Sequence, residues 1–246
     1  MRFNTPGETT DTILGGALTI VQPASGYRFS VDSILLARFA QVRTRDRVLD
    51  LGAGCGVIAV AIAALHHPRA IVALELQAEL ADLAARNGAL NGCANFTAIH
   101  ADLRRRNIAC VTPGSFEVTV ANPPYRALRT GRDSPIAARR LARGESAATL
   151  SNFVSAAYRY TRDGGRASFV FTASRTAELI ATLRRHHLEP KRIRFVHPRA
   201  NLSAATVLIE ARKRGGIEAA IEPALILYDA PGVYSAEARH LLLDPP

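Results

Sequence analysis

The run VLDLGAGCGVIAVAIA, residues 48–63, constrains the fold of this chain more than any other part of the sequence. An apolar stretch with the character of a buried strand leads into glycines at alternate positions, and an apolar stretch of helical length follows. Glycine permits the tight turn between strand and helix, and it leaves room for a ligand beside the backbone. The run therefore predicts a strand–turn–helix unit of an α/β fold with a binding site at the turn.

Strand-like and helix-like segments alternate along most of the chain. Alternation at this spacing predicts βαβ units and a doubly wound, mostly parallel sheet of seven strands. The last two strand-like runs have no helix between them, which predicts an antiparallel edge strand. We expect strands at residues 47–52, 70–76, 96–103, 115–124, 164–172, 193–198 and 204–213, and helices at 56–65, 77–92, 150–160 and 177–187.

Composition and charge narrow the class of protein. The 246 residues are 48% apolar and 21% charged, which is typical of a globular chain and excludes a disordered one. The net charge of +10 attracts polyanions, so nucleic acid is the expected partner. Three cysteines without CxxC spacing favour buried thiols in a reducing cytoplasm over a metal site. No apolar run is long and unbroken enough to predict a signal peptide or a membrane span.

Acidic residues mark the ends of two further expected strands. Glu75 and Asp102 would meet in one crevice, where carboxylates can accept hydrogen bonds from ribose hydroxyls and from an adenine amino group. A dinucleotide is one candidate ligand for this crevice. The spacing G-x-G-x-G after Asp50 instead favours a cofactor with a cationic end, such as S-adenosylmethionine, because a carboxylate beside a pyrophosphate is unfavourable.

The sequence ANPPY, residues 121–125, ends the fourth expected strand. Two prolines fix the backbone there and leave carbonyl groups without local partners. The Asn122 amide oxygen and the Pro123 carbonyl can both accept from an amino group, and Tyr125 offers a flat face for stacking a planar base. Two fixed acceptors stabilise the charge that grows on an exocyclic nitrogen during methyl transfer, so no strong general base is required.

Together, these motifs resemble those of class I S-adenosylmethionine-dependent methyltransferases that act on planar amino groups. Residues 10–40, with a Gly-Gly hairpin, GYR and an Asp-containing helix start, resemble the family that methylates the 6-amino group of adenosine 37 in a valine tRNA. Residues 223–242 are similar to that family's C-terminal tail. The resemblance implies a Rossmann-like methyltransferase domain over residues 41–246, with an N-terminal extension, 1–40, packed on the cofactor side.

The resemblance also implies roles for individual residues. Glu75 would hold the ribose of the cofactor, and Asp102 with Leu103 its adenine. Asn122, Pro123 and Tyr125 would form the catalytic turn, with Asn122 also close to the cofactor. The methionine part would lie beside Asp50, Gly52, Ala53, Gly54 and Gly56, while Tyr27, Phe29 and Asp32 would close over the cofactor from the N-terminal side.

The expected substrate is an adenine in structured RNA, with tRNA the favoured kind, because a basic segment follows the ANPPY turn directly. Its arginines are positioned to contact phosphates around a flipped-out base: Arg126, Arg129, Arg132, Arg139, Arg140 and Arg143. A protein glutamine side chain is an alternative substrate, since the same turn can grip an amide. A non-catalytic nucleic-acid-binding domain is a further alternative. The sequence leaves open whether the protein is a monomer or a homodimer.

Overall fold

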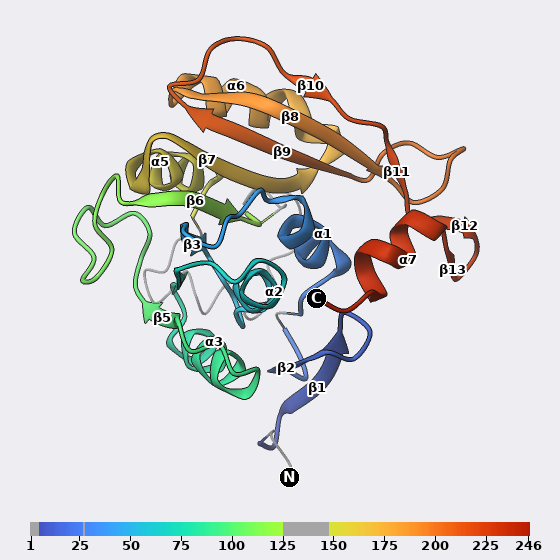
Figure 1. Ribbon diagram of the computed structural model, residues 1–246, viewed down its shortest axis with the longest axis horizontal. Coiled ribbons are helices and arrows are strands. Elements are labelled where there is room, and N and C mark those ends of the chain that lie inside the picture. Colours follow the sequence, from blue (N-terminus) through green and yellow to red (C-terminus); the bar gives the residue numbers. More distant parts are fainter. Residues whose placement is uncertain (1–4, 27, 125–147) are drawn as a thin grey trace, which may run out of the picture.

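A nine-stranded sheet forms the centre of the computed structural model, which describes residues 5–26, 28–124 and 148–246 (Figure 1). Seven strands form the body of the sheet, in the order β8-β9-β7-β6-β3-β4-β5, and two short strands, β10 and β11, pair with β8. The bounds are β3 (Arg47–Leu51), β4 (Ala70–Glu75), β5 (Phe96–His100), β6 (Phe116–Ala121), β7 (Thr161–Thr172), β8 (Leu188–His197), β9 (Thr206–Lys213), β10 (Ala220–Ile221) and β11 (Leu225–Ile226).

This arrangement confirms the predicted α/β, Rossmann-like fold and its seven-stranded body, but it corrects the place of the antiparallel strand. β9 is antiparallel to both β7 and β8 and lies between them, not at an edge. The short connection from β8 to β9 permits only neighbouring antiparallel strands. The crossover from β7 to β8 leaves one strand position free beside β7, and β9 fills it.

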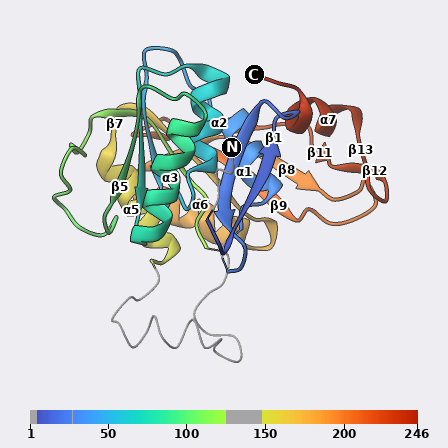
Figure 2. The same cartoon turned by 90° about the horizontal axis from the view of Figure 1, so that it is seen from below.

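Helices cover both faces of the sheet (Figures 1 and 2). One face packs against α1 (Val31–Phe39), α2 (Val57–His66) and α3 (Ala78–Leu90), and the other against α5 (Leu150–Tyr160) and α6 (Thr176–Arg185). The bounds of α5 match the predicted helix at 150–160. α7 (Ala236–Leu243), which the sequence analysis did not predict as a helix, contacts α1. Because the parallel strands are buried on both faces, their sequences are almost continuously apolar.

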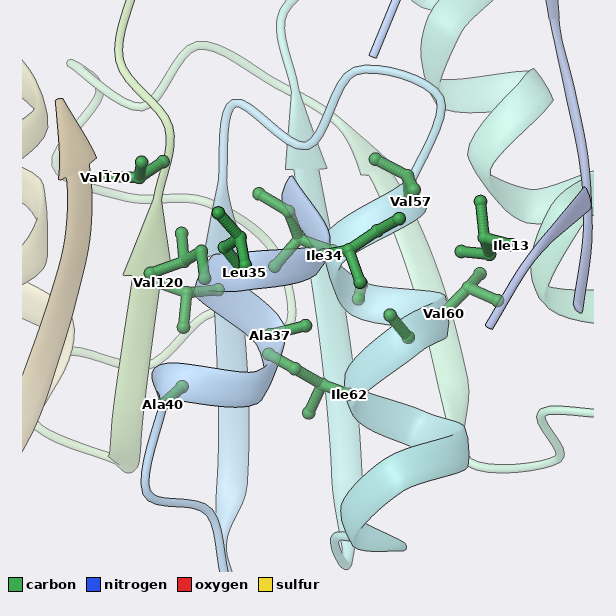
Figure 3. Close-up of a cluster of buried hydrophobic side chains, with 14 of the residues drawn as sticks. Ile13, Ile34, Leu35, Ala37, Ala40, Val57, Val60, Ile62, Val120 and Val170 are labelled. Atoms are coloured by element: carbon green, nitrogen blue, oxygen red, sulfur yellow. The ribbon is translucent and has the colours of Figure 1, made fainter. Parts of the chain in front are cut away.

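The core on the α1–α2 face is built from short aliphatic side chains. Figure 3 shows Ile62 of α2 beside Ala37 of α1, Val60 on the other side of α2 beside Ile13, and Val120 of β6 next to α1. Ala59, Ala61 and Ala63 of α2 are buried in the same core. Small side chains allow helices to approach closely, so α1 belongs to the same core as the sheet although it lies within the predicted N-terminal extension.

A hairpin of β1 (Glu8–Ile13) and β2 (Leu18–Pro23) lies beside α3 in both overall views (Figures 1 and 2). Asn87 of α3 and Asn91, which follows the last residue of α3, satisfy the backbone of β2. The Asn87 side chain accepts from the Val21 N–H and donates to the Val21 carbonyl, both at 2.8 Å, and Asn91 does the same with Thr19. Asn87 also donates to the Cys55 carbonyl in the glycine turn, so the hairpin is tied to that turn.

The structure also bears on the predictions about cysteines, membrane spans and metal sites. The thiols of Cys55, Cys93 and Cys110 are free, but only Cys55 is buried as predicted, since Cys93 is half-buried and Cys110 is exposed. Burial raises the pKa of Cys55 to about 12, which makes this thiol unreactive. Within residues 5–26, 28–124 and 148–246, no helix is long and apolar enough to cross a bilayer. The same residues contain no group of three histidine, cysteine or acidic side chains placed to hold a metal ion.

Candidate active site

A cleft of about 470 Å³ opens at the carboxyl ends of β3, β4, β5 and β6. This edge of an open parallel sheet, near the point where the strand order reverses, is where ligands bind in α/β folds. Each strand end contributes residues to the wall, and the N-terminal segment and α5 close the remaining sides. The lining residues are Arg28, Phe29, Ser30, Gly52, Leu74, Glu75, Leu76, Gln77, Ala101, Asp102, Leu103, Asn122, Pro123, Pro124, Ala148 and Phe153.

The glycine turn after β3 has a different role at each end. Gly52 lines the cleft with φ at +71°, and a Cβ there would lie 2.8 Å from the Phe153 ring. Gly56 begins α2 with φ at +84°, and a Cβ there would lie 2.9 Å from that of Ala84 on α3. Only Gly52 of the turn lines the cleft; Gly54 and Ala53 do not, and Gly56 is required by helix packing.

Glu75 at the end of β4 is held by the backbone of two neighbouring segments. Its Oε2 accepts from the Gly54 N–H at 2.9 Å, and its Oε1 accepts from the Gln77 N–H at 2.9 Å. The residue is 6% exposed and lines the cleft. Because each carboxylate oxygen has a second acceptor position, Glu75 can still accept two hydrogen bonds from a pair of hydroxyls.

Asp102 and Leu103 follow β5 and also line the cleft. Arg104 binds the Asp102 carboxylate through its side chain, with its Nη2 2.6 Å from Oδ2, and through its backbone N–H. Hydrogen bonding to the Arg104 side chain is the main cause that lowers the pKa of Asp102. Asp102 is therefore ionised at neutral pH and available as an acceptor beside the apolar surface of Leu103.

Asp50 lies in β3, fully buried, and is absent from the cleft wall. Among the described residues, no group within hydrogen-bond distance donates to either oxygen. Burial, with a smaller contribution from the Glu75 charge, raises the pKa of Asp50 to about 8, and the nearby Ala59 amide opposes this rise only partly. An uncompensated acid two residues before the glycine turn is a feature that a nearby cation would relieve, so Asp50 fits a cofactor with a cationic end.

Asn122 ends the run that begins in β6, and it reaches the cleft together with Pro123 and Pro124. Asn122 is half-buried and Pro123 is buried, while Pro124 is exposed. The cleft thus has Glu75 and Asp102 on two strand ends and the amide of Asn122 on a third. Tyr125, predicted to stack on the base, lies outside the described residues.

The N-terminal wall of the cleft depends on the β1–β2 hairpin. The Gln22 side chain, 1% exposed, accepts from the Phe29 N–H and donates to Asp11. Arg28 binds the same Asp11 carboxylate at 3.2 Å. The hairpin therefore positions Arg28 and Phe29 at the mouth of the cleft, as the sequence analysis expected for Phe29 but not for Arg28.

The cleft wall and the set of predicted site residues differ in three respects. Asp32 lies at the start of α1, where its carboxylate accepts from Thr206 of β9 and Ser30, and it is not part of the cleft wall. Gln77 and Phe153 line the cleft without any motif that could have singled them out. Other predicted site residues lie outside the described residues: Tyr27, Arg126, Arg129, Arg132, Arg139, Arg140 and Arg143.

Comparison with protein-family models identifies the family of this chain. The model of the methyltransferase small domain family matches residues 25–188, which include every strand end around the cleft. The chain belongs to the methyltransferase small domain family.

Several curated relatives share the name tRNA1(Val) (adenine(37)-N6)-methyltransferase. The relative from Musicola paradisiaca is 30% identical over 136 residues, 54% of each chain. The relative from Aeromonas hydrophila is 27% identical over 221 residues, 89% of each chain. The first of these matches thus spans about half the length of the curated relative.

Solved structures of methyltransferases share the fold. A predicted O-methyltransferase from Agrobacterium tumefaciens has a TM-score of 0.69 and 24% identity, over 85% of this chain and 94% of that one. M. jannaschii TYW2 in complex with AdoMet has a TM-score of 0.57 and 14% identity, over 85% and 87%. These likenesses support the α/β methyltransferase fold described above.

Proposed function

We propose that this chain transfers a methyl group from S-adenosylmethionine to the exocyclic 6-amino group of an adenine in tRNA. The observation that carries the proposal is the placement of Asn122 and Pro123 in the same cleft as Glu75 and Asp102. Asn122 suits the amino group that accepts the methyl group, and the two acids suit the cofactor. The names of the curated relatives, and the net charge of +10, favour tRNA as the substrate.

The lining residues fit the cofactor part by part. Glu75 would accept hydrogen bonds from the ribose hydroxyls, since its two oxygens are already oriented by backbone N–H groups. Asp102 would accept from the adenine amino group while Leu103 packs against the ring. When bound, the cofactor supplies a methyl group on a sulfonium, and the uncompensated Asp50 lies near enough to the turn to favour that positive charge.

The target amino group needs acceptors more than it needs a base. Its lone pair is delocalised into the ring, so hydrogen bonds from the amino hydrogens to fixed acceptors favour the pyramidal, nucleophilic geometry. The Asn122 amide oxygen and the Pro123 carbonyl are such acceptors. The described lining residues include no histidine, lysine or cysteine that could serve as a general base. The proton would leave the positively charged product to solvent after transfer.

An adenine in an anticodon loop is stacked, so it must turn out of the stack to reach Asn122, at a cost of a few kcal/mol. Contacts with flanking phosphates would offset that cost. The arginines between residues 126 and 143 remain the predicted source of these contacts, and the adenine at position 37 of a valine tRNA is the predicted target. A glutamine side chain could present an amide to the same acceptors, and the experiment below separates the two substrates.

The test is incubation of the protein with labelled S-adenosylmethionine and, separately, total tRNA, ribosomal RNA, DNA and a protein lysate. Nucleoside mass spectrometry then identifies the product. We expect N6-methyladenosine in the tRNA sample alone. Label in glutamine residues of protein, with none in tRNA, would contradict the proposal and support the alternative substrate. Absence of cofactor binding by calorimetry would instead support a non-catalytic domain.

A further inference from the structure

A second cleft, of about 570 Å³, lies at the opposite edge of the sheet, where the parallel strands β3, β6 and β7 begin. We call it the basic cleft, because seven cationic and three acidic side chains line it. Glu117 in this cleft and Asn122 in the cofactor cleft lie near opposite ends of β6, so the two clefts are separated by roughly 15–20 Å of strand. The basic cleft therefore belongs to neither the cofactor site nor its mouth.

Three of the seven cations that line the basic cleft form ion pairs with carboxylates. Arg166 binds Asp46 at 2.7 Å, and Asp46 is only 2% exposed. Arg162 binds Glu117 at 3.3 Å. The Arg166–Asp46 pair forms the buried floor of the cleft, and the Arg162–Glu117 pair neutralises two further charges nearer its surface.

Arg192 is held in the floor of the cleft from several sides. It contacts Glu222 at 2.7 Å and Glu210 at 3.5 Å, and its guanidinium lies 4.3 Å from the centre of the Phe39 ring. Arg192 thus joins β8 to α1 and closes one end of the cleft. A floor braced in this way keeps its shape when no ligand is present, which lowers the ordering cost of binding.

The other four cations that line the basic cleft form no ion pair with a carboxylate of the described residues. Arg212 donates its Nε–H to the Gly164 carbonyl at 3.1 Å, and Lys191 donates to the Gly216 carbonyl at 3.1 Å. These bonds orient both side chains without compensating their charge. Arg43 and Arg45 are exposed at the rim, and no carboxylate of the described residues forms an ion pair with any of the four.

We propose that the basic cleft binds phosphate groups. Four uncompensated cations around a braced polar floor match the charge of two or three linked phosphates, and guanidinium groups bind phosphate oxygens in a bidentate manner. The volume exceeds what one phosphate fills, so the ligand class is a linear polyphosphate or successive phosphodiesters of an RNA strand. Both sources present the same chemistry to the cleft.

The first arm of the test uses inorganic tripolyphosphate, titrated calorimetrically into the full chain at low salt. The variant Arg43→Gln/Arg45→Gln changes only exposed side chains, and Lys191→Gln provides a second, independent variant from β8. The control is Arg185→Gln/Arg239→Gln, which removes the same charge from exposed positions on α6 and α7. We expect the wild type and control to bind one tripolyphosphate at this site and both cleft variants to bind it at least tenfold more weakly.

The second arm identifies the source of the phosphate. If RNA phosphodiesters occupy the cleft, Arg43→Gln/Arg45→Gln flattens the log–log salt dependence of tRNA affinity by roughly two, and the control does not. An unchanged tRNA slope with weakened tripolyphosphate binding assigns the cleft to a free polyphosphate. Tripolyphosphate binding that is absent in the wild type, or equal in the wild type and the cleft variants, overturns the proposal. Because this arm measures binding alone, failure of methyl transfer to tRNA would not affect its reading.

Discussion

The two edges of one sheet hold clefts of similar size, about 470 Å³ and 570 Å³. The edges differ in whether their buried acidic side chains are paired with cations. At the carboxyl edge, Glu75 is held by backbone N–H groups, and Asp50 has no hydrogen-bond partner among the described residues. At the amino edge, Asp46 and Glu117 are paired with arginines. The carboxyl edge thus keeps the carboxylate of Glu75 available to a ligand in the cleft and leaves the buried Asp50 uncompensated, while the amino edge pairs its acids internally and keeps positive charge available.

The largest effect that separates the two edges should come from the pH dependence of Asp50→Asn. Burial raises the pKa of Asp50 from 3.8 to about 8, so the folded chain holds a proton that the unfolded chain loses between these values. The free energy of unfolding of the wild type should therefore fall as pH rises from about 4 to about 8, by on the order of 5 kcal/mol from this residue. Asp50→Asn should lose this dependence, measured by urea unfolding at a series of pH values.

The matched change at the amino edge is Asp46→Asn, which should lower the free energy of unfolding at pH 8, whereas Asp50→Asn should raise it. Removing this carboxylate leaves Arg166 without the ion pair at 2.7 Å and should lower the free energy of unfolding by about 3 kcal/mol at pH 8. Asp50→Asn should be more stable than the wild type at that pH. If both variants are destabilised to the same extent, the contrast between the two edges is wrong.

A smaller effect tests whether Gly56 serves packing or the ligand. Gly56→Ala places a Cβ 2.9 Å from Ala84 at a φ of +84°, and should destabilise the chain by about 3 kcal/mol. Gly92→Ala is the control, because its φ is +67° with nothing within 4 Å of the new Cβ, and should cost about 1 kcal/mol. Equal losses in urea unfolding would show that packing against α3 is not the reason for glycine at residue 56.

The smallest expected effect concerns cofactor affinity. Glu75→Gln replaces one acceptor oxygen with a donor that faces a backbone N–H, so S-adenosylmethionine should bind about 2 kcal/mol more weakly, near thirtyfold. The exposed Glu79→Gln on α3 is the control and should bind as the wild type does. Calorimetry measures both, and an unchanged affinity for Glu75→Gln would remove Glu75 from the ribose site.

Local sequence predicted the elements of this fold better than their arrangement. The helix at 150–160 and the strand starting at residue 47 could be predicted because apolar periodicity and glycine turns are local signals. The position of β9 between β7 and β8 depends on which strand position a crossover leaves free, and no local pattern records that. The anchoring of β2 by Asn87 and Asn91 likewise joins residues about seventy positions apart.

The two clefts also differ in how far local sequence could predict their residues. Gly52, Glu75, Asp102 and Asn122 could be predicted because each lies at or just after the end of a strand, and parallel strands bring their carboxyl ends to one edge. The contact that a Cβ at Gly56 would make with Ala84 of α3 could not be predicted, because no sequence pattern shows that α3 lies against the turn. The basic cleft joins residues between 41 and 212 with no shared motif, so the sequence showed only the net charge of +10.

The most direct test of the account is the rate of N6-methyladenosine formation on tRNA by Asn122→Ala, with S-adenosylmethionine affinity measured on the same preparation. The exposed Asn107→Ala is the control. Asn122→Ala should lower turnover by about a hundredfold or more, because an acceptor for the transition state is lost, and should leave cofactor affinity nearly unchanged. A variant with wild-type turnover, or one in which only the Michaelis constant for tRNA rises, would contradict the claim that Asn122 acts on the reacting amino group.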